Sequence, residues 1–212
     1  MVSLVSISMA KKSIPLVTGQ KYHVYNRGVD KRVIFSDKSD YLRFYLSMDY
    51  FNCVDVTTEF NRASTQKNKQ EDKLVQLHAY CLLNNHFHLI IEQLKDGGIS
   101  EFMKRVSVGY TGYFNEKNNR LGSLFQGTYK RVHIKTDEQA NYLFAYVNEN
   151  HIVHGVGEPS DIFATSAKHY ELSMQSKVLP KSTKLISRKE NQKLAKTIFD
   201  RRVFLKKELF EL

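Results

Sequence analysis

The sequence predicts an α+β fold, namely a split βαβ antiparallel sheet of the ferredoxin-like or RRM-like type with two helices on one face. Segments rich in β-branched and aromatic residues alternate with segments whose apolar residues recur at helical spacing, in the order strand, helix, strand, strand, helix, strand. The hydrophobic fraction of 42% in 212 residues is also that of a globular protein with a sizeable core. The second face of the sheet would be left open for a site.

The first strand and the first helix are expected near the N-terminus. Residues 21–26 are rich in β-branched and aromatic side chains, as in a strand. Apolar residues recur at helical spacing from Ser39 onward, and Ser36 or Asp37 would cap that helix. The polar, lysine-rich residues 57–73 then have the composition of a mobile or DNA-contacting loop.

A hairpin is expected next, because two apolar runs flank Asn84 and Asn85. Asparagine tolerates the positive φ angles of tight hairpin turns. Thr136 and Gln139 fit a capping box, which predicts a third helix that lies near the second face of the sheet. The elements expected after Leu74 are, in chain order, strands at 74–83 and 86–92, a helix at 100–118, a strand at 128–134 and a helix at 136–150.

The C-terminal part is expected to form a basic helical extension. Residues 175–212 hold 11 Lys and Arg against 4 Asp and Glu, so they carry +7 of the formal net charge of +10. Ser187 and Glu190 fit another capping box. On this basis we divide the chain into a compact domain at 17–155 and an extension at 156–212.

Charge and composition restrict the class of function. A net charge of +10 favours a polyanionic partner such as nucleic acid or an acidic membrane surface. No run approaches the ~18 apolar residues of a membrane span and the N-terminus has no leader pattern, so we expect a cytoplasmic protein with no membrane partner. The two cysteines, Cys53 and Cys81, are too few for a disulfide framework or a four-thiolate zinc site.

His86 and His88 form a candidate metal-binding pair. Side chains at i and i+2 of a strand share a face, so the two imidazoles project together while Phe87 points into the core. An isolated pair of this kind is more often a packed or surface pair. Here the strand is strongly apolar, and because unpaired polar rings are costly to bury, we expect the two histidines to have partners.

The helix after Thr136 carries a polar stripe that could border these histidines. Tyr142, Tyr146 and Asn150 recur at steps of four and therefore share one helix face. The adjacent stripe of Leu143 and Val147 can pack on the sheet. Most helical tyrosines are packing residues, so a chemical role for either tyrosine stays one of two interpretations at this point.

Four segments resemble the REP-associated tyrosine transposases, which fall within the insertion-sequence single-tyrosine HUH transposase superfamily. The segments occur in the family's order between about residues 20 and 155, and they contain both a histidine-hydrophobic-histidine and a tyrosine-x-x-x-asparagine motif. Together the two motifs are far more specific than either alone. The segments are 22–28 (YHVYNRG), 85–89 (NHFHL), 122–126 (GSLFQ) and 146–150 (YVNEN).

The resemblance implies a metal-dependent enzyme that nicks and rejoins single-stranded or hairpin DNA through a 5′-phosphotyrosine intermediate. His86, His88 and Asn150 would hold Mg²⁺ or Mn²⁺, Tyr146 would be the nucleophile, and Tyr142 is its rival. Domain 17–155 would then be the catalytic domain. No general base for the nucleophile is evident in the sequence.

Two positions depart from the family pattern, and both could alter the ligand geometry or the grip on DNA. His151 stands where many members have proline, and Thr128 stands where arginine is common. Basic clusters and one nearby aromatic residue are the candidate DNA contacts. They are Arg27, Lys104, Arg105, Tyr129, Lys130, Arg131, Arg188, Lys189, Arg201 and Arg202.

Several alternatives stay open from the sequence. The first is a non-catalytic RRM-like module that binds single-stranded nucleic acid by stacking bases on aromatic residues. The second is a metallohydrolase that uses water, with Tyr146 in a structural role. The third is a domesticated nickase that acts at chromosomal palindromic repeats. A homodimer and a monomer are both compatible with the resemblance.

Overall fold

The centre of the computed structural model is a four-stranded antiparallel sheet with the strand order β2-β3-β1-β4. The structure describes residues 15–54, 72–150, 164–167, 192–193 and 195–197. The elements are β1 (Lys21–Arg27), a 3-10 turn (Val29–Lys31), α1 (Lys38–Tyr50), β2 (Val75–Leu83), β3 (His86–Gln93), α3 (Gly98–Lys117), β4 (Lys130–His133) and α4 (Asp137–Asn148). This order and this sheet are the predicted split βαβ arrangement.

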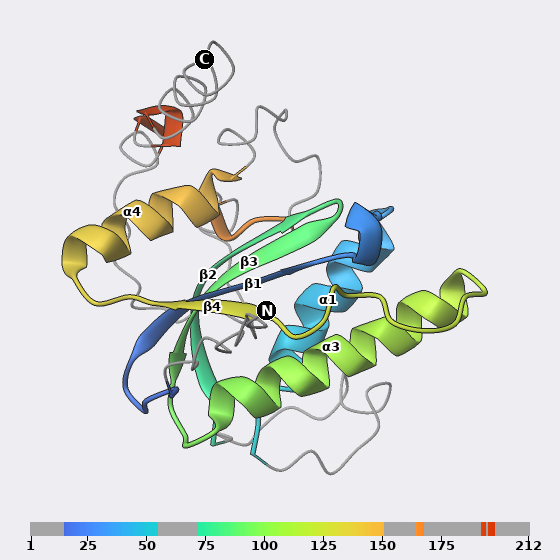
Figure 1. Ribbon diagram of the computed structural model, residues 1–212, viewed down its shortest axis with the longest axis horizontal. Coiled ribbons are helices and arrows are strands. Elements are labelled where there is room, and N and C mark those ends of the chain that lie inside the picture. The colour runs from blue at the N-terminus through green and yellow to red at the C-terminus, as the bar shows by residue number, and fades with distance from the viewer. Residues whose placement is uncertain (1–14, 55–71, 151–163, 168–191, 194, 198–212) are drawn as a thin grey trace, which may run out of the picture.

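The helices lie on both faces of the sheet. Figure 1 shows α1 and α3 on one side and α4 on the other. The larger core fills the space under α1 and α3, where the ring of Phe87 from β3 lies 5.1 Å from that of Phe44 in α1. As predicted, the third helix, α4, lies at the second face of the sheet, and it covers part of that face. A smaller core of Ala79, Cys81, Leu83, Ile90, Ile134 and Val147 joins α4 to the sheet.

Local signals set the ends of the helices. Asp37, one of the two expected caps, accepts hydrogen bonds from the backbone N–H groups of Ser39 and Asp40 and begins α1. Helix α3 begins at Gly98, two residues before the predicted start. A Cβ atom at Gly98 would lie 2.4 Å from the carbonyl oxygen of Leu74, so glycine allows this helix end to approach the start of β2.

The predicted hairpin between β2 and β3 is correct, but the reason given for it is wrong. Neither Asn84 nor Asn85 adopts a positive φ angle. Their carbonyl groups instead accept backbone hydrogen bonds from the segment that follows β1: Asn84 from the N–H groups of Ile34 and Phe35, and Asn85 from that of Gly28. Tertiary contacts therefore hold this turn, and they tie it to the end of β1.

The predicted capping box of α4 is present with a small shift. The Thr136 side chain accepts a hydrogen bond from the backbone N–H of Gln139. The Gln139 side chain accepts from the N–H of Lys135, one residue before the position that a capping box uses. As predicted, Leu143 and Val147 pack on the sheet, and Ala140, Phe144 and Tyr146 pack against the same core.

Residues 164–167 attach to the edge of β2, although they lie within the predicted extension at 156–212. The N–H of Leu82 donates to the carbonyl of Ala164, and that of Tyr80 donates to the Ser166 hydroxyl. Ser166 in turn donates to the Asn148 side chain over 2.5 Å, and Thr165 donates to the Asn148 carbonyl over 2.9 Å. These contacts connect the C-terminal end of α4 to the sheet.

Several predictions fall mostly or wholly outside the described residues. They concern the loop at 57–73, apart from its last two residues, and the basic extension with Ser187, Glu190, Arg188, Lys189, Arg201 and Arg202. Within the described part of the chain, no helix combines the length and the apolar character that a membrane crossing requires.

Replacing Ser166 tests the connection between α4 and the sheet edge. We expect Ser166→Ala to lower the free energy of unfolding by about 2 kcal/mol, because the buried Asn148 oxygen and the Tyr80 N–H both lose a partner. Ser100→Ala, at an exposed and longer contact to Tyr129, is the control and should change it by less than about 0.5 kcal/mol. Urea unfolding measures both values, and equal stabilities of the two variants would contradict the role of residues 164–167.

Candidate active site

The strand register places both histidines on the face that α4 covers. In the β1–β3 pair Tyr25 lies opposite His88 and Arg27 lies opposite His86, and directly paired residues share a face. Phe87, between the histidines, points to the other side and is fully buried in the larger core. The period of two that was expected for this strand therefore holds in the structure.

His86 has a well-defined partner for one of its ring nitrogens. Its Nδ1 lies 2.6 Å from the side-chain oxygen of Asn85. The side-chain nitrogen of Asn85 lies 3.3 Å from the Lys31 carbonyl, which agrees with this orientation of the amide. Because an amide oxygen only accepts, Nδ1 of His86 donates, and in the neutral ring Nε2 carries the lone pair.

His88 is held by a third histidine, His23 of β1. The Nδ1 atom of His88 and the Nε2 atom of His23 are 2.9 Å apart, and each side chain is only 6% exposed. Burial lowers the pKa of His23 to about 4, so this ring is neutral at pH 7. The rings of His23, Tyr25 and His88 also stack on one another, with centroids 5.1 to 5.6 Å apart.

Helix α4 brings Tyr146 against these rings. Its ring meets His88 and His23 edge-on, at centroid distances of 5.4 and 5.9 Å. Tyr142, one turn earlier, is 42% exposed and makes no ring contact with the histidines in the described part of the chain. The structure therefore places Tyr146, and not its rival, beside His88 and His23.

Asn150, the expected third ligand, is fully buried just beyond α4. Its side-chain nitrogen lies 3.2 Å from the Tyr146 carbonyl, and its side-chain oxygen has no hydrogen-bond partner among the described residues. The backbone N–H of Asn150 lies against the thiol of Cys81, which is paired with His88 across the hairpin. An unsatisfied buried oxygen costs about 1 to 3 kcal/mol, and a cation would satisfy it.

Two imidazoles and a carboxamide oxygen form a donor set that a hard or borderline divalent ion accepts. Among the described residues, no three His, Cys, Asp or Glu side chains are grouped so that they could hold a metal ion. A site that includes Asn150 would not count among such groups, because its third ligand is an asparagine. The orphaned oxygen of Asn150 and the Nδ1 contacts of His86 and His88 are compatible with the chemistry of such an ion.

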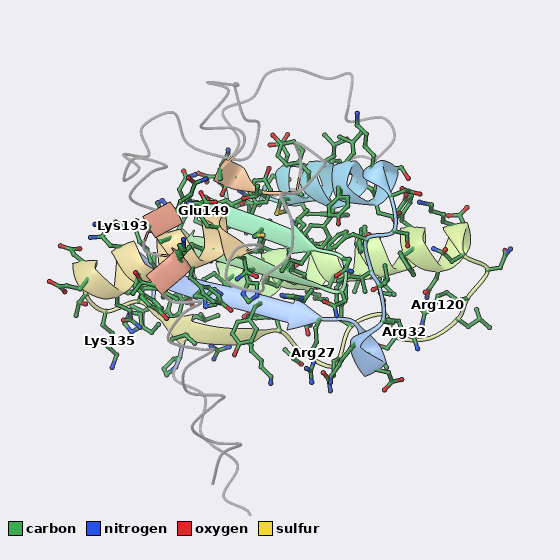
Figure 2. All side chains as sticks on the ribbon, turned by 90° about the horizontal axis from the view of Figure 1, so that it is seen from above. Arg27, Arg32, Arg120, Lys135, Glu149 and Lys193 are labelled. Carbon is green, nitrogen blue, oxygen red and sulfur yellow. The ribbon has the colours of Figure 1, made fainter. Side chains whose placement is uncertain are left out.

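Two residues at this site were not among those predicted from the sequence. Glu149, labelled in Figure 2, is fully buried. Burial of the Cys81 thiol raises its pKa, and the Glu149 carboxylate raises that pKa further. A buried carboxylate makes the site more favourable for a cation. His23 lies within the segment 22–28 that carries the family resemblance. Its contact with His88 depends on the β1–β3 register, which no sequence signal specifies.

The structure separates the predicted DNA-contacting residues. Arg27, seen at the arrowhead end of β1 in Figure 2, and Lys130, opposite Tyr25, are on strand positions that face the histidine side. Arg131 is paired with Val24 and has the opposite orientation. Lys104 and Arg105 belong to α3, on the far side of the sheet, and Tyr129 packs against the larger core there.

Some of these side chains already have partners. The guanidinium of Arg105 bonds to Glu101 and to the Cys53 carbonyl, at 2.7 Å each. The hydroxyl of Tyr129 is 3.3 Å from that of Ser100. Arg27 contacts the side chain of Gln126, and Lys130 is exposed. Arg27 and Lys130 are therefore the two described candidates that share a face with the histidines.

Comparison with known proteins gives two matches. Residues 52–150, slightly under half of the chain, match the family described as "Transposase IS200 like". A solved structure described as the REP-associated tyrosine transposase bound to a REP hairpin is similar to this chain, with a TM-score of 0.50 and 12% sequence identity. The similarity covers 84% of this chain and 96% of that one. No curated protein matches the sequence.

The family match includes β2, β3, α3, β4 and α4, and so contains His86, His88, Tyr146 and Asn150. At 12% identity the similar solved structure supports the fold alone. The resemblance that the motifs indicated is therefore confirmed: residues 52–150 match the IS200-like transposase family, and the fold of the chain is similar to that of a REP-associated tyrosine transposase.

Proposed function

We propose that this protein is a metal-dependent DNA endonuclease and strand transferase that uses Tyr146 as its nucleophile. The family match and the similar fold support a transposase-type DNA-binding protein. The observation that carries the finer proposal is the position of Tyr146, whose ring touches both His88 and His23 while Asn150 lies one turn further along. This arrangement supports a role for Tyr146 as a nucleophile beside a metal site.

His86, His88 and Asn150 would hold a divalent ion, Mg²⁺ or Mn²⁺. Such an ion supplies charge that polarises and orients the scissile phosphate. The protein contributes the rest of the environment. Burial of His88 and Asn150 excludes water from the donor atoms, and the Glu149 carboxylate adds negative charge nearby.

The proposed reaction is a transfer of one phosphodiester bond to the protein. The phenolic oxygen of Tyr146 attacks the phosphorus, the bond from phosphorus to the 3′ oxygen breaks, and the phenolic proton passes to solvent. The departing strand takes up a proton and leaves with a free 3′ hydroxyl, while the 5′ phosphate stays on Tyr146. Because the ester bond is retained, a 3′ hydroxyl can later attack the phosphotyrosine and rejoin DNA without an external energy source.

Single-stranded DNA with a hairpin is the proposed substrate. The similar solved structure is bound to a REP hairpin, and this chain carries a net charge of +10. Arg27 and Lys130 stand on the histidine side of the sheet, where they can contact the phosphates that flank the reacting bond. The basic extension would add contacts to the DNA backbone, and a homodimer stays a prediction.

The Tyr146 proposal predicts a covalent adduct. The full chain, incubated with Mn²⁺ and a single-stranded oligonucleotide that contains a hairpin from the gene's own flanks, should become linked to a 5′ phosphate. Tyr146→Phe removes only the reacting hydroxyl and should abolish the adduct, while Tyr142→Phe should form it normally. Mass spectrometry of the digested adduct identifies the linked residue. A nucleotide on Tyr142, or cleaved DNA without any adduct, would refute the assignment and favour a water-using hydrolase.

The metal proposal predicts that His86→Ala, His88→Ala and Asn150→Ala each reduce cleavage by at least about 100-fold in Mg²⁺ or Mn²⁺. Binding of single-stranded DNA should persist, because other residues contact the phosphates. His133→Ala is a matched control, since His133 lies on β4 with its ring stacked on Tyr22 on the opposite face. Single-turnover cleavage gives the rates. Wild-type cleavage by the three site variants would contradict the proposed ligands.

The position of the basic residues predicts which of them contact DNA near the site. Arg27→Ala and Lys130→Ala should each weaken DNA binding and lower the slope of log K against log salt by roughly 0.7, the value for one phosphate contact on a single strand. Lys104→Ala, an exposed lysine on α3, should leave the slope unchanged. Fluorescence anisotropy at several salt concentrations measures the slopes. An equal loss in all three variants would argue for nonspecific attraction by net charge.

A further inference from the structure

We infer that His23 is a positioning residue that fixes the tautomer and the ring plane of His88, so that His86 and His88 both present Nε2 to the same ion. This inference rests on the proposed metal site. It concerns a residue of β1, outside the region 52–150 that matches the family. His23 does not touch the ion in this account, because its Nε2 atom is engaged with His88.

The two predicted ligands have matching contacts on the same ring atom. Nδ1 of His86 lies 2.6 Å from the Asn85 oxygen, and Nδ1 of His88 lies 2.9 Å from Nε2 of His23. A metal-bound histidine normally donates its other ring N–H to a carboxylate, a backbone carbonyl or water, and this contact fixes the tautomer. Here an amide oxygen and an imidazole nitrogen occupy the acceptor positions. Asn85 can only accept from His86, so Nε2 of His86 carries the lone pair.

The contact between His88 and His23 permits two tautomer pairs. A single hydrogen bond between two neutral imidazoles needs one donor and one acceptor. If Nδ1 of His88 donates, its Nε2 keeps the lone pair that binds a cation, as in His86. If His23 donates instead, Nε2 of His88 carries a proton and cannot bind an ion. Only the first pair gives two histidines with the same ligating atom.

Packing fixes the plane of the His88 ring as well. His23 stacks on His88 with a centroid distance of 5.1 Å and an interplanar angle of 19°, and Tyr25 stacks on it at 5.6 Å. His23 also meets the edge of Tyr146 at 5.9 Å. The same side chain therefore contacts a predicted ligand and the proposed nucleophile, and its burial under α4 leaves it little freedom to turn.

Two substitutions separate hydrogen bonding from packing. His23→Gln keeps an acceptor near the position of Nε2, whereas His23→Phe keeps an aromatic ring and removes the acceptor. Each full-length variant is titrated with Mn²⁺ alone in a calorimeter, without DNA, and its thermal unfolding confirms that it is folded. We expect His23→Phe to weaken Mn²⁺ binding by about 10- to 100-fold and His23→Gln to stay within about threefold of wild type.

The tautomer itself is measured without any metal. Long-range proton–nitrogen spectra of the imidazoles should show wild-type His88 with its proton on Nδ1, and His23→Phe should give a mixture of the two tautomers. A His88 ring protonated on Nε2 in the wild type would overturn the inference. Wild-type Mn²⁺ affinity in His23→Phe would also overturn it, and a loss in His23→Gln as large as that in His88→Ala would make His23 a direct ligand instead.

Failure of this inference can be distinguished from failure of the proposed function. If His86→Ala and His88→Ala lose Mn²⁺ binding while His23→Phe binds normally, the metal site stands and the role of His23 falls. If His86→Ala and His88→Ala bind Mn²⁺ as the wild type does, the proposed metal site itself is wrong, and the positioning role falls with it.

Discussion

The antiparallel register between β1 and β3 is the constraint on which the site depends. It sets Tyr25 opposite His88 and Arg27 opposite His86, and it brings His23 within hydrogen-bond distance of His88. Because side chains alternate between the faces of a strand, a slip by one residue would turn the β1 side chains to the opposite face. The turn between β2 and β3 is bonded to the chain after β1, which helps to hold this register.

Helix α4 is the second structural requirement, because it must carry a reactive side chain and also remain fixed on the sheet. Leu143 and Val147 anchor its apolar stripe, and this turns Tyr146 toward the histidine rings. Its C-terminal end is tied down by hydrogen bonds from Thr165 and Ser166 to Asn148. A helix held by packing along its length and by polar contacts at its end can keep a phenol in place against a small target.

Several buried polar groups lie together where α4 ends over the sheet. His23, His88, Asn148, Glu149 and Asn150 are all buried there. Protein interiors normally avoid such groups unless they are paired, and each one that lacks a partner costs free energy. The unpartnered oxygen of Asn150 is an example within the described part of the chain. A protein optimised for stability alone would place apolar residues here, so this polarity is consistent with a requirement of function.

The sequence by itself determined the order of the elements, the antiparallel sheet, the cap of α1 and the shared face of His86 and His88. These features follow from short-range periodicity and local hydrogen bonding, which neighbouring residues specify. The family motifs also pointed to Tyr146 and Asn150. Their roles at the site remain predictions, but the helix that carries them lies where its apolar stripe required.

Only the tertiary structure decided how those elements meet. The partnership of His23 with His88 joins residues 65 positions apart, and the contact of residues 164–167 with β2 joins Ser166 to Tyr80 across 86 positions. The hairpin turn at Asn84 and Asn85 shows the same dependence, since distant backbone groups hold it where a local preference for positive φ was expected. Local patterns can specify which face a side chain occupies, but strand register and helix docking select its partner, because those choices depend on the packing of the whole sheet.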